Sequence, residues 1–372
     1  MNPLPCSPLA LECKPLPYPL QAAMNLLAPL VAPLLLALLL TACQKDPETI
    51  LSGSIQGTTY HLKMVTRDVP VTAEELKTDV EAIFRLIDEQ LSNWRDDSEI
   101  SRFNQQKTTD WQTVSPTLIH LLTIAREIHD RTDGCYDLTV KPLFELWGFA
   151  QHEQTVPATA DIHRVLTHVG MDKLEIDPIG KRLRKMDPVL EVSLDSIAQG
   201  YTVAVIAQSL EDRGIQNYLA EIGGEMKVKG VKADGTPWRV AVEKPTPMAR
   251  EVQRVFELNE AAGMAVMTSG TYRNFFESGG KSYSHIINPK TGMPVSHKTL
   301  STTVLHEDPT LADAWSTALL CLGEDQGIKL ADEQRLKALF IYREGDQLKE
   351  QMSAELTNQF KATPAPEMPA NP

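Results

Sequence analysis

Asp313 and Thr317 stand four residues apart in the segment Ala312-Asp-Ala-Trp-Ser-Thr317. Residues at this spacing lie on one face of an α-helix, so the carboxylate and the hydroxyl would point the same way. One carboxylate with neutral oxygens is a poor ligand set for Ca²⁺. It suits Mg²⁺, which keeps several waters and binds jointly with substrate phosphates. On spacing alone a cap or an exposed polar pair is the commoner outcome, so other parts of the sequence must decide.

Several common enzyme motifs are missing. Gly279-Gly-Lys-Ser282 resembles the end of a P-loop, but Phe275 stands where its first glycine belongs. No GxGxxG, HExxH or GxSxG motif occurs, and the nine histidines do not cluster at zinc-ligand spacing. The net charge of −13 argues against a nucleic-acid partner, which normally meets a basic surface. An acidic protein must hold an anionic ligand locally, through backbone amides, helix N-termini or a bound cation.

The hydrophobic pattern predicts interleaved helices and strands that would position these residues. A capping box at Thr72 and Glu75 begins a long amphipathic helix. A second helix begins at Ser115-Pro116 and ends at Asp133-Gly134. Further helices are expected from about 197 to 214 and across 313–317 to 323, with strands at 217–222, 238–243 and 262–268.

Tryptophan and cysteine positions give additional expectations. We expect Trp94, Trp147 and Trp315 to be core anchors. If the chain is exported, Cys6 and Cys13 are removed with the signal peptide and Cys43 carries the lipid, so Cys135 and Cys321 remain. The sequence is compatible with a disulfide between them and with two buried thiols. Cys135 is otherwise interpreted as a packing residue.

The N-terminus is typical of a bacterial lipoprotein signal. Residues 24–40 are uncharged and precede Leu40-Thr-Ala-Cys43, which resembles a lipobox. A spanning helix needs about 20 apolar residues, so this length fits a signal-peptide core better than a transmembrane segment. We expect lipid on Cys43 and a location at the periplasmic face of the inner or outer membrane, and an uncleaved anchor is the alternative.

Four regions are therefore predicted. Residues 1–42 form a signal peptide and 43–54 a tether. The folded domain occupies 55–360, and 361–372 is a disordered Pro-rich tail.

Several motifs occur in the order of those of the ApbE family, the FAD:protein FMN transferases, which the chain resembles. TSGTY at 268–272, YSHIINPKTGMP at 283–294 and Ala312-Asp313 resemble the TSGxY, SHIIDPxTGxP and AD motifs. The upstream matches are GTTY at 57–60, SNW at 92–94, SEISRFN at 98–104, GCYDLTVKPL at 134–143, LWGF at 146–149, IAQGY at 197–201 and EIGGE at 221–225. The resemblance covers about residues 55–325.

The resemblance implies a mixed α/β domain of two lobes with FAD in the cleft between them. By similarity, Mg²⁺ would be held by the Asp313 carboxylate, the Thr317 hydroxyl and backbone carbonyls near Ala198 and Ser316, with FAD phosphate oxygens completing the shell. His285 is the candidate general base, because imidazole titrates near neutral pH, and a structural histidine is its alternative role. The implied FAD-binding residues are Thr58, Asp137, Thr139, Gln199, Gly223, Gly224, Glu225, Thr268, Ser269 and Gly270.

The implied reaction is attack by a Ser or Thr hydroxyl of an acceptor redox protein on the FMN-side phosphorus of FAD, with release of AMP. Two other functions fit the same residues. In an FAD pyrophosphatase water would replace the acceptor hydroxyl, and in a storage lipoprotein FAD would bind without reacting.

The chain departs from the family pattern at four places. Gln199 stands where a lysine is usual, Ser193-Leu-Asp-Ser196 replaces Asp-Leu-Gly-Gly, Asn288 replaces an aspartate, and Gln56 replaces a methionine. These changes alter local charge, so we expect lower phosphate affinity or a different acceptor preference.

Overall fold

Strand pairing begins at Glu48 in the computed structural model, which describes residues 48–55, 57–150, 154–246 and 251–360. Strand β1 (Glu48–Ile55) pairs along its whole length with β2 (Thr58–Val65). The ordered domain therefore starts inside the range expected to be a tether, earlier than the predicted boundary at 55. The predicted signal peptide, Cys43, Gln56 and the tail lie outside the described residues.

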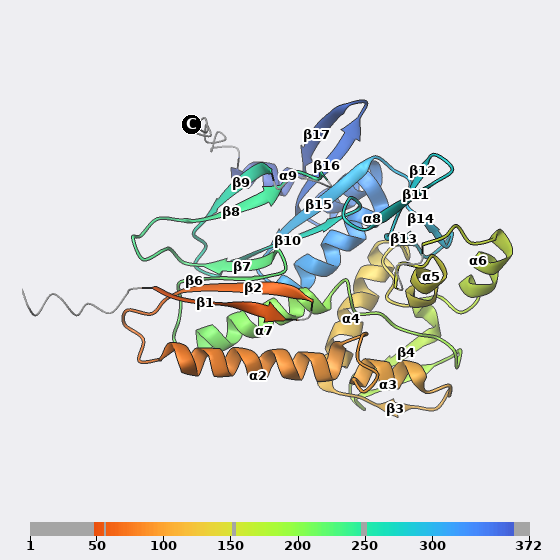
Figure 1. The fold of residues 1–372 in the computed structure, drawn as a ribbon, viewed down its shortest axis with the longest axis horizontal. Coiled ribbons are helices and arrows are strands. Elements are labelled where there is room, and N and C mark those ends of the chain that lie inside the picture. Colours follow the sequence, from red (N-terminus) through yellow and green to blue (C-terminus); the bar gives the residue numbers. More distant parts are fainter. Residues whose placement is uncertain (1–47, 56, 151–153, 247–250, 361–372) are drawn as a thin grey trace, which may run out of the picture. The chain divides into compact units, whose positions relative to one another are not determined.

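An eight-stranded sheet lies at the centre of this unit (Figure 1). Its strand order is β1-β2-β6-β7-β10-β15-β16-β17, and every neighbouring pair is antiparallel. The remaining strands are β6 (Tyr218–Ile222), β7 (Glu225–Lys229), β10 (Met264–Gly270), β15 (Thr299–His306), β16 (Lys337–Glu344) and β17 (Gln347–Met352).

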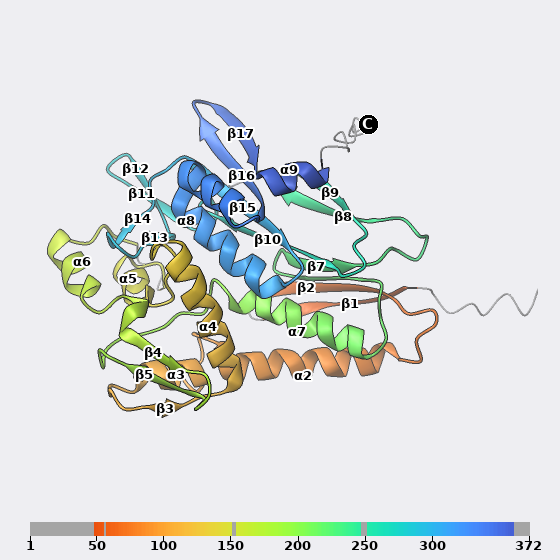
Figure 2. The ribbon, with the colours of Figure 1, turned by 180° about the vertical axis from the view of Figure 1, so that it is seen from behind.

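Three helices cover one face of the sheet, as Figure 2 shows: α2 (Ala73–Leu91), α7 (Ala198–Asp212) and α8 (Pro309–Glu333). The other face is covered by the hairpin of β8 (Trp238–Glu243) and β9 (Val252–Leu258) and by α9 (Ala354–Phe360). Strand β10 serves both faces because its side chains alternate: Ala265 and Met267 join the helix-side core, and Val266 joins the opposite one.

The remaining elements pack at one end of the sheet. They are α3 (Glu99–Gln105), α4 (Pro116–Arg131), α5 (Lys141–Leu146), α6 (Thr159–Leu166), a short 3-10 helix (Met171–Lys173), β3 (Gln112–Thr113), β4 (Leu174–Asp177), β5 (Arg182–Lys185), β11 (Phe275–Ser278), β12 (Lys281–Ser284), β13 (Ile287–Asn288) and β14 (Met293–Pro294). One hydrophobic cluster runs from α3, α4 and β4 to the sheet helices without interruption. The two expected lobes therefore share a core.

Most of the predicted elements are confirmed. The Thr72–Glu75 capping box begins α2, and Ser115 caps α4 with Pro116 in its first turn. Trp147 and Trp315 are buried as expected. The prediction for Trp94 is wrong, because 72% of its surface is exposed. No helix in the described part of the chain is both long and apolar enough to cross a membrane.

Helix α8 continues beyond its predicted end, but it breaks there. Gly323 has φ 77° and ψ −178°, a conformation that only glycine adopts without strain, and the chain resumes helical geometry up to Glu333. The ring of His297 lies against this break, within 2.7 Å of the position that a Cβ of Gly323 would take. The first part of α8, which carries Asp313 and Thr317, therefore ends at a break in the helix near Cys321.

Helices α7 and α8 are in close contact at Gly200. A Cβ at this position would lie 2.4 Å from the Pro309 carbonyl oxygen and 2.5 Å from the Cβ of Asp313. Real Cβ atoms do not come this close, so the glycine sets the separation of the two helices.

We expect Gly200→Ala to destabilise the protein by about 1–3 kcal/mol, because an added methyl group in a close-packed contact forces the helices apart. Denaturant unfolding followed by circular dichroism would measure the loss. Gln208→Ala, at an exposed position on the same helix, is the control and should have little effect. An unchanged unfolding midpoint for Gly200→Ala would contradict this account of the helix contact.

Candidate functional site

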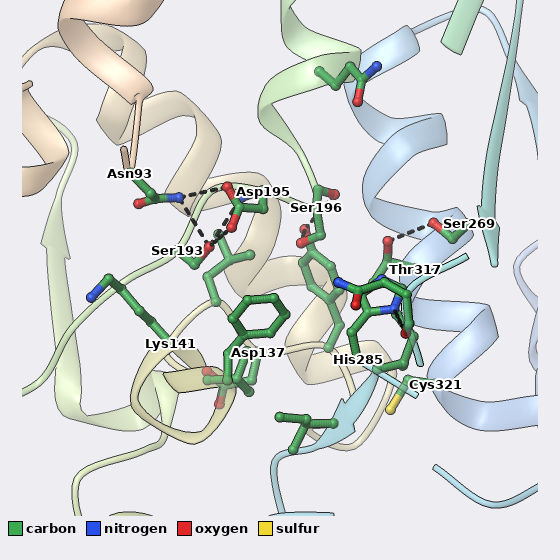
Figure 3. Close-up of a pocket in the computed structure, with 18 of the residues that line it drawn as sticks. Asn93, Asp137, Lys141, Ser193, Asp195, Ser196, Ser269, His285, Thr317 and Cys321 are labelled. Atoms are coloured by element: carbon green, nitrogen blue, oxygen red, sulfur yellow. Dashed lines mark hydrogen bonds between the residues drawn. The ribbon is translucent and has the colours of Figure 1, made fainter. Parts of the chain in front are cut away.

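A cavity of about 690 Å³ lies between the sheet side and the α4–α5 side of the fold (Figure 3). From the sheet side, α7, α8, β7 and β10 contribute Gln199, Asp313, Thr317, Cys321, Glu225, Thr268, Ser269 and Gly270. From the other side, the segment after α4, helix α5, the 193–196 segment and the turn before β13 contribute Cys135, Tyr136, Asp137, Lys141, Asp195, Ser196 and His285.

A second cavity of about 720 Å³ adjoins the first. Asn93, Trp94, Asp195 and Gln199 line both, so these residues form the junction of the two cavities. Trp94 is exposed at this junction and is a site candidate rather than a core anchor.

Asp313 is held at the base of the first cavity by the close contact of α7 with α8. Its Oδ2 accepts a hydrogen bond of 2.7 Å from the backbone N–H of Gly200, and only 6% of the residue is exposed. Burial raises the pKa of this carboxyl to about 7, because a buried carboxylate loses the hydration that stabilises its charge.

Glu225 is a second carboxyl in the same place. It accepts a hydrogen bond of 3.0 Å from the backbone N–H of Thr268. Burial, followed by the nearby charge of Asp313, raises its pKa well above the ordinary value. Among the described residues neither carboxylate forms an ion pair within 4.0 Å. A buried carboxyl beside a second, half-buried one, with no cation in ion-pair contact with either, is what a bound cation would stabilise.

Three hydroxyl groups lie beside Asp313. The Ser269 hydroxyl is 2.7 Å from that of Ser316 and 2.8 Å from that of Thr317 (Figure 3 shows the latter). The predicted alignment of Asp313 and Thr317 on one helix face is confirmed, because both side chains line the cavity.

No cluster of three or more His, Cys, Asp or Glu side chains suited to a metal occurs within the described ranges. A cation here would depend on one carboxylate, hydroxyls, backbone carbonyls and ligand oxygens, a set that suits Mg²⁺.

The two predicted carbonyl ligands already accept hydrogen bonds. The Ser316 carbonyl accepts one of 2.6 Å from the Thr302 hydroxyl, and the Ala198 carbonyl one of 2.7 Å from the Thr202 hydroxyl. Both residues also lie within helices, so a cation would compete with the helical N–H four residues on for the second lone pair of either oxygen. Ala198 lines the second cavity rather than the first.

His285 lines the first cavity in one defined tautomer. Its Nδ1 is 3.0 Å from the Asn274 carbonyl oxygen, which can only accept, so Nδ1 carries the proton. Burial lowers the pKa of this imidazole, which keeps the ring neutral near pH 7. Nε2 then has a free lone pair, as a general base requires.

Asp137 and Thr139 form a structural unit within the loop after α4. Asp137 Oδ1 accepts from the backbone N–H (2.7 Å) and the hydroxyl (2.6 Å) of Thr139, and Oδ2 accepts from the Met171 N–H at 3.0 Å. Asp137 lines the cavity, but Thr139 is fully buried and outside it. The expected contact of Thr139 with FAD is therefore not supported, because its hydroxyl and N–H are engaged in shaping the loop.

The predicted glycine contact is also indirect. Gly223 lies against the side chains of Gln199 and Thr58, where a Cβ would come within 2.3 Å of the Gln199 amide nitrogen. Gly223 and Gly224 line neither cavity, whereas Thr58 lines the second and Gln199 both. Gly223 therefore gives room to Gln199, whose amide donates a hydrogen bond of 2.6 Å to the Ile222 carbonyl.

The sequence analysis did not identify two cationic side chains that line the first cavity. Lys141 binds Glu191 at 2.6 Å, and Arg273 pairs with Glu243 at 2.5 Å. Lys141 lies within the matched segment GCYDLTVKPL, and Arg273 directly follows TSGTY, so their proximity to these motifs could have identified both residues.

Asp195 lies in the segment that departs from the family pattern. It accepts hydrogen bonds from Asn93 (2.9 Å) and Ser193 (2.8 Å) at the junction of the two cavities.

Cys135 and Cys321 form a disulfide, which settles the alternatives that the sequence left open. The bond joins residues 186 positions apart, and both cysteines line the first cavity. It connects the loop carrying Asp137 to the helix carrying Asp313 and Thr317.

The chain is similar in sequence and in fold to proteins that are named flavin transferases. The sequence model of the ApbE family matches residues 56–340. An FAD:protein FMN transferase from Vibrio cholerae is 38% identical over 320 residues, which cover 85% of this chain and 94% of that protein. One from Haemophilus influenzae is 38% identical over 316 residues, covering 83% and 90%.

Solved structures agree with these sequence matches. The flavin transferase ApbE from Vibrio cholerae superposes with a TM-score of 0.77 at 36% identity, covering 84% of this chain and 98% of that one. The apo form of the Pseudomonas stutzeri flavinyl transferase ApbE gives a TM-score of 0.78 at 36% identity, covering 86% and 98%.

The buried carboxyl of Asp313 predicts a pH-dependent stability. Since the pKa of Asp313 rises from 3.8 to about 7 on folding, the folded state holds a proton that the unfolded chain has already released between these values. Stability of the cation-free protein should therefore fall as the pH rises from about 4 to 7. Asp313→Asn should weaken this dependence and raise stability at pH 8 by a few kcal/mol, since one pKa unit corresponds to about 1.4 kcal/mol.

Urea unfolding with a chelator at pH 5 and pH 8 would measure this effect. Asp325→Asn, at an exposed position on the same helix, provides the control and should leave the pH dependence unchanged. If the free energy of unfolding depends on pH in the same way in wild type and in Asp313→Asn, burial does not raise the pKa of this carboxyl.

Proposed function

Because the chain belongs to the ApbE family, we propose that it moves FMN from FAD to a Ser or Thr hydroxyl of an acceptor redox protein and releases AMP. One observation carries the proposal. Asp313, Thr317, Ser269 and His285 line a single cavity, which shares Gln199 with a neighbouring cavity, in a chain that matches flavin transferases over most of their length.

The residues fit Mg²⁺ with FAD as substrate. Asp313 and Thr317 would hold the cation with the Ser316 and Ala198 carbonyls, and the buried charge of Asp313 next to Glu225 supports this assignment. When bound, Mg²⁺ supplies positive charge that stabilises the transferred phosphoryl group and the leaving oxygen. Thr268, Ser269 and Gly270 at the end of β10 line the same space and would contact the flavin nucleotide.

His285 would take the proton of the attacking hydroxyl. The Asn274 carbonyl fixes the ring so that Nε2 is the free basic atom. Burial keeps this ring neutral and ready to accept a proton. The edge of Phe149, with ring centroids 6.4 Å apart, borders the imidazole and helps to limit its hydration.

We also propose that the chain is exported and anchored to a membrane through lipid on Cys43. The disulfide between Cys135 and Cys321 supports an oxidising compartment, since such bonds are rare in the cytosol. Mass spectrometry of the membrane fraction would test this assignment: a lipidated N-terminal peptide starting at Cys43 supports it, and an intact 1–42 segment contradicts it.

The decisive experiment mixes the chain with FAD, Mg²⁺ and an acceptor protein carrying a flavinylation threonine, and follows AMP release and acceptor mass. We expect a mass gain equal to FMN that requires Mg²⁺ and that disappears in Asp313→Ala, because the cation loses its only carboxylate ligand. Asp325→Ala is the matched control on the same helix. AMP with free FMN would indicate a pyrophosphatase instead, and bound but intact FAD a storage protein.

His285→Ala should lower the transfer rate by about 10²–10⁴-fold, which is the usual contribution of a general base. FAD affinity, measured by quenching of flavin fluorescence, should change little, because the imidazole acts on the acceptor hydroxyl. His168→Ala serves as the control at a histidine outside both cavities. Wild-type transfer rates in His285→Ala would remove this residue from the mechanism.

A further inference from the structure

We propose that the Cys135–Cys321 disulfide positions the FAD site, so that FAD affinity depends on the thiol–disulfide state of the chain. The inference rests on the proposed function, since it assigns FAD to the cavity. The two cysteines are therefore a positioning pair that acts through the residues beside them. The geometry of both sides of the bond supports this role.

On one side, the disulfide holds the helix that carries the proposed cation ligands. Cys321 follows Thr317 by four residues and Asp313 by eight, so the three side chains share one face of α8. Only two residues later the helix breaks at Gly323. The bond therefore fixes the end of the first part of α8 at the point where the helix itself loses continuity.

On the other side, the disulfide holds a loop that lines the same cavity. Cys135 follows Asp133 and Gly134, which both have positive φ, and it begins the lining segment that continues to Leu138. The loop is hydrogen-bonded to α4 through Thr132 and to Ser196 through the Tyr136 hydroxyl. Within the described part of the chain, no hydrogen bond joins residues 134–139 to α8.

The disulfide is therefore the covalent link between the two walls of the cavity, in addition to their shared hydrophobic core (Figure 3 labels Cys321 beside His285 and Thr317). Its reduction by a dithiol would break the S–S bond and give two thiols, with two electrons and two protons supplied by the reductant, which becomes a disulfide itself. The loop with Asp137 and the helix with Asp313 could then separate, and FAD bound between them would lose contacts on one side.

FAD binding and reduction of the Cys135–Cys321 disulfide must influence each other by the same factor. If reduction weakens FAD binding tenfold, bound FAD must make the disulfide harder to reduce by the same factor. For a two-electron couple this factor corresponds to about 30 mV in the midpoint potential. A disulfide that merely stabilises the fold at a distance from the ligand would show no such shift.

The test uses the full-length chain in detergent, without acceptor protein. FAD affinity is measured by flavin fluorescence for the oxidised chain, for the chain reduced with dithiothreitol, and for Cys135→Ala/Cys321→Ala. We expect FAD to bind at least tenfold more weakly to the reduced chain and to the double variant. Dithiothreitol should not alter the double variant further, which excludes effects through Cys6, Cys13 or Cys43.

A redox titration of the wild-type pair with and without saturating FAD provides a second measurement that needs no variant. We expect a more negative potential with FAD. In the transfer assay, reduction should raise the KM for FAD more than it lowers kcat, because saturating FAD restores the closed arrangement. Circular dichroism of the double variant verifies that it is folded.

Equal FAD affinities in all three forms, or a potential that FAD leaves unchanged, would overturn the inference. These outcomes are distinct from failure of the proposed function. An oxidised chain that binds FAD in a disulfide-dependent way but never modifies an acceptor contradicts the transferase and leaves the disulfide inference standing.

Discussion

The close approach of α7 and α8 at Gly200 is the contact on which the site depends. It lets the backbone N–H of Gly200 donate to Asp313 and buries most of this carboxylate at the wall of the cavity. A single amide hydrogen bond does not compensate for the lost hydration of a carboxylate, and Glu225 adds a second carboxyl nearby. The fold therefore disfavours the ionised form of both carboxyls, and a bound cation would stabilise that form, which is a physical reason for a metal-dependent nucleotide site in an acidic chain.

The antiparallel sheet brings distant segments of the sequence to this place. Strand β7 supplies Glu225, the neighbouring strand β10 supplies Ser269, and α8 lies across β10 with Thr317 facing the serine. The loop with Asp137 comes from the opposite side. Among the described residues no hydrogen bond joins it to α8, and the contact consists of the disulfide and a shared hydrophobic core. The sheet side is held by hydrogen-bond pairing between strands, whereas the attachment of the loop to α8 includes a covalent bond that a reductant can break.

Local sequence signals predict the features that depend on local geometry. The capping box of α2 and the shared helix face of Asp313 and Thr317 follow from residue spacing, and both are present. Features that depend on tertiary packing were not predictable in this way. Thr139 is directed inward by its hydrogen bonds with Asp137, and the exposure of Trp94 follows from the junction of two cavities. Pairing of Cys135 with Cys321 requires a distance that spacing in the sequence does not contain.

Gln199 shows how one substitution changes the electrostatics of this site. A lysine at this position would carry a mobile positive charge toward the junction of the cavities, whereas the glutamine amide is neutral and is bonded to the Ile222 carbonyl. The two other cations that line the first cavity, Lys141 and Arg273, are paired with carboxylates and contribute less net charge. The negative charge of a bound diphosphate must then be balanced mainly by the metal. Flavin nucleotide and metal should therefore bind as a coupled pair in this chain, since each supplies the charge that the other requires.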